Sequence, residues 1–228
     1  MNTFKRKPRL SQISSLCAVM FMLLPSLLQA QETTKITYIL PSGSTYKLVD
    51  RNIKELYIFQ TEAVSIQGLS NLPYLEKVTF EIPAHLKDFS FLDDCPNLKV
   101  LHLMDCSPQN LDFLYRQHEL AELVMQSCKL GSEFINISQI PSLDYLEISN
   151  SGLEQVPITV SNIKSSHQLT CINLAYNMIS KLSSTERQIL DVAKYVIIEG
   201  NSVQVNDQKY LKGDLFSILP QAYRKYIR

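Results

Sequence analysis

Residues 95–106 read "CPNLKVLHLMDC", and the same order of residue types occurs twice more nearby. It appears upstream as "LPYLEKVTF" (72–80) and downstream as "IPSLDYLEI" (140–148). Each copy has an apolar residue or cysteine, a proline, any residue, a leucine, two residues, and then two apolar residues separated by one position. A chain that repeats a short pattern at a fixed period is built from stacked copies of one structural unit.

Alignment on the central leucines extends the pattern to seven segments, each apolar at positions 1, 4 and 6. They are 53–61, 75–83, 98–106, 120–128, 143–151, 169–177 and 193–201, with starts 22, 23, 22, 23, 26 and 24 residues apart. Side chains alternate along a strand, so positions 4 and 6 point to one face and positions 3, 5 and 7 to the other. A single unit cannot bury its apolar face alone, and we therefore expect the units to stack around a shared core.

Position 9 of each segment is usually small or polar, and position 11 is often apolar. Position 9 holds, in order, Thr61, Pro83, Cys106, Cys128, Ser151, Asn177 and Asn201. The pattern resembles that of the leucine-rich repeat family, L-x-x-L-x-L-x-x-(N or C)-x-L, and the spacing is similar to that of the bacterial internalin type. The resemblance implies an α/β fold: a right-handed solenoid with a parallel concave β-sheet, an irregular, 3-10 or helical convex side, and terminal caps. It also implies an asparagine ladder at position 9, regular in the last repeats and degraded in the first two.

The flanks of the repeats differ in composition from the repeats themselves. Residues 1–30 have a basic start and a short apolar stretch, "LCAVMFMLL" (16–24), which predicts a secretory signal peptide cleaved after Ala30. The apolar stretch is shorter than the roughly 20 residues of a membrane span, although a retained anchor is the alternative interpretation. We predict an N-terminal cap of one or two strands at 31–52, about seven repeats at 53–203, and a C-terminal cap with a short helix at 204–228.

Composition and charge narrow the function. Of the 228 residues, 45% are hydrophobic. Residues 1–30 contain four basic residues and no acidic residue. The rest of the chain therefore has 18 basic and 22 acidic residues, a net charge of −4. A mildly acidic body argues against nucleic-acid binding. The scattered histidines and six glycines form no metal, hydrolase or phosphate-binding motif. We therefore expect no enzyme activity, no cofactor and no metal site.

The four cysteines beyond the predicted signal peptide leave two interpretations open. Cys95 occupies a core position, Cys171 an outward strand position, and Cys106 and Cys128 occupy position 9 of consecutive repeats. Buried free cysteine behaves as a small hydrophobic residue. Because neighbouring strands lie about 5 Å apart, however, a disulfide between Cys106 and Cys128 is also geometrically possible.

The strand face that points away from the core carries unexpectedly many apolar and aromatic residues for a solvent-facing surface. Exposed apolar patches rimmed by charge often mark contact surfaces, so this face is the predicted binding site. Its candidate binding residues are Tyr57, Phe59, Val100, His102, Met104, Val124, Tyr145, Glu147 and Tyr195. Two alternatives remain: strands simply favour such residues, or a terminal cap folds over this face.

The sequence as a whole predicts a non-catalytic, protein-binding repeat domain exported to the bacterial cell envelope, periplasm or surface. The alternatives are a scaffolding protein of the envelope without a soluble ligand and, in third place, an enzyme with an unrecognised site. We expect a protein partner and no nucleic acid, and membrane contact only if residues 1–30 are retained. No oligomeric state and no identity of the partner is predicted.

Overall fold

The computed structural model describes residues 32–59, 62–81, 85–161, 169–204 and 210–211. The predicted signal peptide, the predicted helix of the C-terminal cap and the position-9 residues Thr61 and Pro83 lie outside the described residues.

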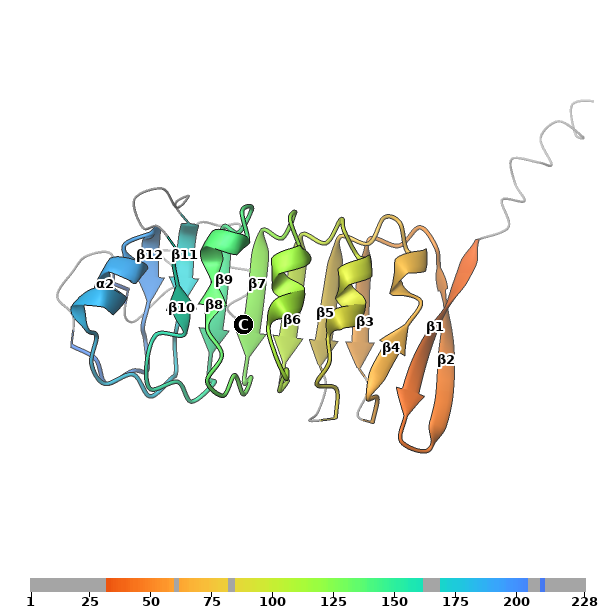
Figure 1. Cartoon of the computed structure of the whole chain (residues 1–228), viewed down its shortest axis with the longest axis horizontal. Helices are drawn as coiled ribbons and strands as arrows, with labels where there is room; N and C mark the ends of the chain where they lie inside the picture. The colour runs from red at the N-terminus through yellow and green to blue at the C-terminus, as the bar shows by residue number, and fades with distance from the viewer. Residues whose placement is uncertain (1–31, 60–61, 82–84, 162–168, 205–209, 212–228) are drawn as a thin grey trace, which may run out of the picture.

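An eight-stranded, fully parallel sheet runs the length of the molecule (Figure 1). Its order from the N-terminal end is β3 (Glu55–Phe59), β5 (Lys77–Glu81), β6 (Val100–Met104), β7 (Glu122–Gln126), β9 (Tyr145–Ser149), β11 (Leu169–Asn173), β12 (Ala193–Ile197) and β13 (Tyr210–Leu211). Each of the seven repeat segments contains one strand, as predicted; β13 follows the last repeat and was not predicted.

The register of the sheet confirms the alignment of the repeats. Position 3 of each repeat segment pairs with position 3 of the next segment. The paired residues form the row Glu55, Lys77, Val100, Glu122, Tyr145, Cys171 and Tyr195. The row is unbroken across the 26-residue step between β9 and β11, because the extra residues lie outside the strands. The side chains at positions 4 and 6 are buried in all seven repeats and form one continuous hydrophobic core.

The opposite side of the core is covered by short elements that lie in front of the strands in Figure 1. These are the 3-10 helices η1 (Leu69–Asn71), η2 (Ser90–Asp94), η3 (Asp112–Arg116) and η4 (Ile137–Gln139), the helix α2 (Ser184–Leu190), and the paired strands β8 (Ile135–Asn136) and β10 (Ile158–Thr159). Apolar residues three positions apart suit a 3-10 turn, which has three residues per turn. This arrangement confirms the predicted leucine-rich repeat solenoid with a 3-10 and helical convex side.

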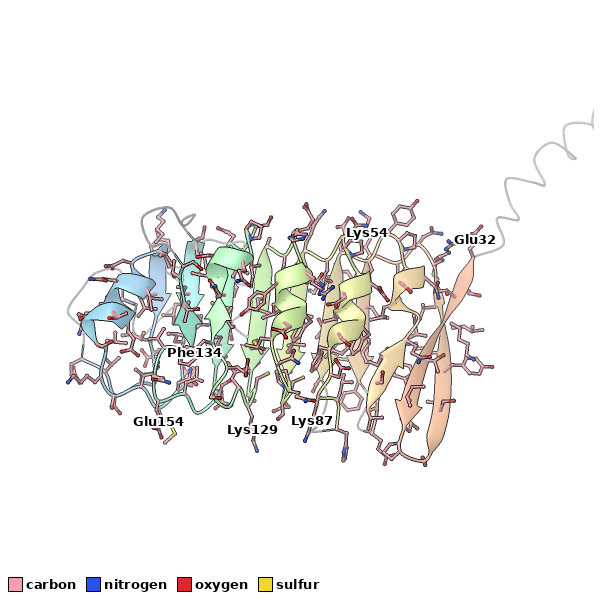
Figure 2. All side chains as sticks on the ribbon, in the orientation of Figure 1. Glu32, Lys54, Lys87, Lys129, Phe134 and Glu154 are labelled. Atoms are coloured by element: carbon pink, nitrogen blue, oxygen red, sulfur yellow. The ribbon has the colours of Figure 1, made fainter. Side chains whose placement is uncertain are left out.

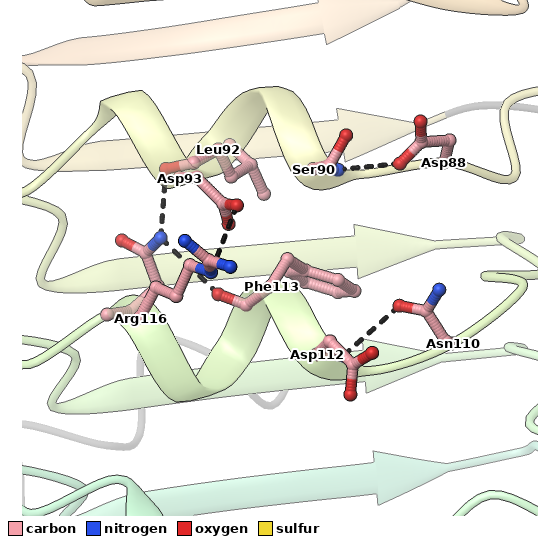
Figure 3. A network of polar contacts seen from close by, with 9 residues as sticks. Asp88, Ser90, Leu92, Asp93, Asn110, Asp112, Phe113 and Arg116 are labelled. Carbon is pink, nitrogen blue, oxygen red and sulfur yellow. Dashed lines mark hydrogen bonds and ion pairs between the residues drawn. The ribbon is translucent and has the colours of Figure 1, made fainter.

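Neighbouring convex turns are joined by polar contacts (Figure 3). Arg116 Nε on η3 lies 3.2 Å from Asp93 Oδ2 on η2. Gln117 occupies a core position where other repeats have Leu72, Cys95 or Ile140, and its side-chain amide donates to the Leu92 carbonyl over 2.9 Å. The buried polar side chain thereby links one repeat to the previous one.

Asparagines at position 9 form the predicted ladder in the last two repeats. Asn177 donates from Nδ2 to Ile148 O over 2.7 Å, and its Oδ1 accepts from the backbone N–H groups of Ser151 and Leu153. Asn201 repeats this arrangement one turn later, donating to Leu174 O over 2.7 Å. Each asparagine thus satisfies backbone groups of two adjacent turns, which would otherwise be buried without partners.

The N-terminal end of the core is closed by an antiparallel sheet of order β2-β1-β4. It comprises β1 (Thr33–Leu40), β2 (Gly43–Asp50) and β4 (Ser65–Gln67), with a turn at Pro41 and Ser42. Ile36 and Ile66 of this sheet are buried in the continuous core. One or two strands were predicted before the repeats, and the structure contains two, β1 and β2. The exact domain boundaries stay predictions.

Candidate functional site

The face of the large sheet that points away from the core, formed by positions 3, 5 and 7 of each repeat, is the concave face. Its environment changes along the solenoid. On β3, Tyr57 is 53% exposed and Phe59 is 63% exposed. On β6, Val100 and Met104 are partly exposed. The part of the concave face on β3, β5 and β6, which we call the open half, thus presents accessible apolar side chains.

The strand register shows how these side chains are grouped. Tyr57 pairs with Thr79, which pairs with His102, and Phe59 pairs with Glu81, which pairs with Met104. Phe59 and Met104 are therefore two strands apart, with the carboxylate of Glu81 between them. At about 4.8 Å per strand, the two side chains lie within the footprint of one bound segment.

The part of the concave face on β7, β9, β11 and β12, which we call the closed half, is mostly buried, although Gln126 at the end of β7 is exposed. Five of its side chains form a second hydrophobic cluster, separate from the core: Val124, Tyr145, Cys171, Ala175 and Ile197. Tyr145 is 0% exposed, although its side chain points away from the core. Tyr195 is half-buried against this cluster.

The expectation that all nine candidate residues face solvent is therefore wrong for four of them. Val124 and Tyr145 are buried in the apolar cluster, whereas His102 and Glu147 are buried with polar partners. Strand alternation specifies that these side chains leave the core, but exposure also depends on packing across the outer face. Their role in binding is not decided by burial and stays a hypothesis.

A buried polar network accompanies the apolar cluster. His102 Nε2 lies 2.6 Å from Glu122 Oε1 on the adjacent strand, with both side chains about nine-tenths buried. The hydroxyl of Tyr145 donates to Glu147 Oε2 over 2.7 Å, and the Ser149 hydroxyl donates to Glu147 Oε1 over 2.6 Å. Each buried carboxylate therefore has hydrogen-bonding partners, which reduces the cost of its burial.

Glu122 was not among the predicted site residues. Its position 3 on β7 nevertheless placed it on the same face as His102, one strand away. That parity was the signal available in the sequence, while the contact itself depends on the rotamers of both side chains.

The titratable groups of the closed half are poorly suited to nucleophilic chemistry. Burial, reinforced by the negative charges of Glu147 and Asp144, raises the pKa of the Cys171 thiol to about 12. Burial also raises the pKa of Tyr145 well above its usual range, so the hydroxyl remains a hydrogen-bond donor. Within the described part of the chain, no group of three or more His, Cys, Asp and Glu side chains is placed to hold a metal ion.

Shallow hollows follow the turns after the strands along one edge of the solenoid. One of them has a volume of about 580 Å³ and lies beside Lys129, Gly131, Phe134 and Glu154. Figure 2 shows Lys129 and Glu154 at the lower edge and Phe134 on the convex side. Cations and carboxylates are mixed here, and Phe134 is the large exposed apolar residue of the lining. The hollow thus offers a weaker apolar anchor than the open half.

Among solved structures, the chain is similar to two internalins from Listeria monocytogenes strain 4b F2365. With the internalin inlF it shares 18% identity over 74% of this chain and 59% of that chain, at a TM-score of 0.44. With internalin C2 (inlC2) it shares 16% identity over 71% of this chain and 80% of that chain, also at a TM-score of 0.44. The chain thus spans less than two thirds of inlF. At this level of similarity neither protein indicates what this chain binds.

No protein-family model and no curated protein matches the chain. Among the residues that the structure describes, no helix is long and apolar enough to cross a membrane.

Proposed function

We propose that this protein is a non-catalytic recognition domain that binds a protein partner through the open half of its concave face. The observation that carries the proposal is the pair Tyr57 and Phe59, which are more than half exposed on one strand. Exposed aromatic residues are costly to leave in water and supply a large share of the binding energy in protein interfaces.

The surroundings of this pair suit a protein surface. Three charged residues, Glu55, Lys77 and Glu81, lie on the same face of β3 and β5 as the aromatic pair. An apolar centre with a charged rim is the usual arrangement of a protein interface. The rim has more carboxylates than cations, which favours a partner whose contact surface carries both apolar and basic groups.

The sheet holds this surface in place. Tyr57 and Phe59 alternate with the core residues Leu56 and Ile58, so the backbone of β3 is fixed by the continuous core beneath it. A rigid strand that presents two aromatic side chains loses little conformational entropy on binding. The same rigidity gives no means of excluding water from a substrate, which supports recognition rather than catalysis.

We also propose that the protein is exported, with residues 1–30 removed as a signal peptide. The support is the order of basic, apolar and small residues in this segment. N-terminal sequencing of the protein from the envelope fraction should give a start at Gln31. A start at Met1 in the cytoplasmic fraction would contradict export, and a start at Met1 in the membrane fraction would indicate a retained anchor.

The binding proposal is tested by affinity capture from envelope extracts with three baits. The first is the parent domain, the second carries Tyr57→Ala and Phe59→Ala, and the third carries Tyr74→Ala and Phe134→Ala. Tyr74 and Phe134 are also exposed aromatic residues but lie outside the strands of the large sheet, so the third bait controls for non-specific binding. All three should melt at the same temperature, because exposed side chains contribute little to stability.

The expected result is a partner retained by the parent and by the third bait but lost by the second. Loss of two aromatic anchors, at about 2 kcal/mol each, weakens a micromolar complex to about millimolar. Equal capture of the partner by all three baits would mean that the binding site lies elsewhere. Loss of capture with the third bait alone would mean that the site includes Tyr74 or Phe134. A parent that captures nothing favours the scaffolding function.

A further inference from the structure

Cys106 and Cys128 lie side by side at the ends of adjacent strands. The ladder between β6 and β7 continues past the strands, because Asp105 N donates to Gln126 O and Lys129 N donates to Cys106 O, each over 2.9 Å. The two cysteines are therefore direct neighbours across the ladder. Adjacent strands are separated by about 4.8 Å, within the Cα separation of roughly 4.4–6.8 Å that a disulfide spans.

Both thiols point to the same place. The Sγ atom of Cys106 lies 3.3 Å from Met104 O, and the Sγ atom of Cys128 lies 3.3 Å from Leu103 O, which is the preceding carbonyl on the same strand. Both sulfur atoms therefore lie beside consecutive carbonyl groups of β6.

These positions are weak points of the ladder. Asn177 and Asn201 each form hydrogen bonds to backbone groups of two turns with nitrogen and oxygen atoms. A thiol is a weaker donor and acceptor than an amide. Without a covalent link, repeats three and four are therefore joined less firmly at position 9 than repeats six and seven.

We propose that Cys106 and Cys128 form a disulfide that links repeats three and four when the chain folds in an oxidising environment. The oxidant is a disulfide, either a small molecule such as oxidised glutathione or a thiol–disulfide oxidoreductase. The structure has both cysteines in the reduced form, with 2% and 0% exposure. The reaction therefore takes place while the repeats are assembling, before the turns close over the sulfur atoms.

The chemistry is two successive thiol–disulfide exchanges. The Cys128 thiolate attacks one sulfur of the oxidant, the oxidant's S–S bond breaks, and one thiol is released. The Cys106 thiol then loses its proton and attacks the Cys128 sulfur of the mixed disulfide, which releases the second thiol. Two electrons pass from the two cysteines to the oxidant. The exchange balances equally with the order of the two cysteines reversed.

The experiment uses the full chain, refolded in a glutathione redox buffer and, in parallel, in excess reduced glutathione. Free thiols are alkylated, and the protein is digested with trypsin. Cleavage after Lys99, Arg116 and Lys129 places Cys106 in peptide 100–116 and Cys128 in peptide 117–129. The expected result is a linked pair of these peptides in the oxidised sample only.

The cross-link should also raise the melting temperature. Closing a loop of about 22 residues in the unfolded chain is expected to shift the midpoint upward by about 5–10 °C relative to the reduced sample. A double variant, Cys95→Ser with Cys171→Ser, should keep both the linked peptides and the shift. The single variants Cys106→Ser and Cys128→Ser should lose both.

Alkylation of both Cys106 and Cys128 in an oxidised sample whose circular dichroism shows the folded protein would overturn the proposal. So would peptides linked through Cys95 or Cys171, which lie in peptides 88–99 and 165–181. The result does not depend on the partner-binding proposal, because neither cysteine belongs to the open half.

Discussion

Tyr57 and Tyr145 are tyrosines on the same face of the same sheet, yet their environments are opposite. Tyr57 on β3 is 53% exposed, whereas Tyr145 on β9 is 0% exposed and donates a hydrogen bond to Glu147. Both side chains leave the core because of strand alternation. The difference shows that one face of a solenoid can hold a contact surface at one end and a second packed cluster at the other.

The position-9 residues also change along the solenoid. The turns after β11 and β12 are held by Asn177 and Asn201, whereas the turns after β6 and β7 contain Cys106 and Cys128. Among these four turns, side-chain hydrogen bonding at position 9 is thus strongest at the C-terminal end of the solenoid. Four predictions, each with its own set of variants, test how stability differs along the solenoid.

The largest effect should be the same in both halves, because they share one core. Leu101 lies beneath the open half and Leu146 lies beneath the closed half, and both side chains are fully buried. The variants are Leu101→Asp and Leu146→Asp. An unpaired carboxylate there costs several kcal/mol against a total stability of about 5–15 kcal/mol. Both variants should be unfolded by circular dichroism, while Lys99→Ser, at an exposed position, should melt like the parent. A folded Leu101→Asp protein would mean that the open half is not part of the common core.

The next effect should separate the halves. Tyr145→Ala empties a fully buried aromatic site and should cost about 3–5 kcal/mol in urea unfolding, as for other buried aromatic residues. Tyr57→Ala should change stability by less than about 0.5 kcal/mol. Tyr145→Phe, which removes only the hydroxyl that donates to Glu147, should cost about 1–3 kcal/mol. Equal losses for Tyr57→Ala and Tyr145→Ala would remove the distinction between the two halves.

A smaller difference is expected in the ladder. Asn177→Ala leaves the backbone N–H groups of Ser151 and Leu153 without their side-chain acceptor and should cost about 2–3 kcal/mol. Cys106→Ala in the reduced protein removes one weak thiol hydrogen bond and should cost about 1 kcal/mol. Urea unfolding of both variants under reducing conditions measures the contrast, and a larger loss for Cys106→Ala would reverse the proposed order of the ladder positions.

The smallest effect concerns the convex side of the closed half and depends on pH. Glu186 completes a capping box with Ser183 at the start of α2 and also accepts from Val156 N over 3.0 Å. Burial by itself raises the pKa of Glu186, but the hydrogen bonds from Ser183 and Val156 outweigh it and lower the pKa below 4.5.

Because the folded-state pKa is depressed, this stabilisation is present above pH 4.5 and is lost as the pH falls through the folded value. Glu186→Gln should therefore lower stability by about 0.5 kcal/mol at neutral pH, since the site is partly exposed. The gap from the parent should shrink on acidification in thermal melts at several pH values. A gap that grows below pH 4 would contradict the direction of the shift.

The sequence by itself determined the repeat, the seven strands, their register and the core. An apolar residue stands at the same position of every segment, as Leu101 and Leu146 do at position 4. Strand alternation then assigns each side chain to one face of the sheet. These features are local and repeated, so the register of β11 could be predicted in spite of the 26-residue step that precedes it.

Only the tertiary structure decided what happens on the outer face. Alternation sends Tyr57, Val124 and Tyr145 to that face in the same way, but exposure depends on packing between segments that are far apart in the sequence. The His102–Glu122 contact and the extra strand β13 likewise arise from rotamers and from chain beyond the repeats. A repeated pattern specifies the shared core because every unit must satisfy it, whereas each outward side chain meets a different neighbour.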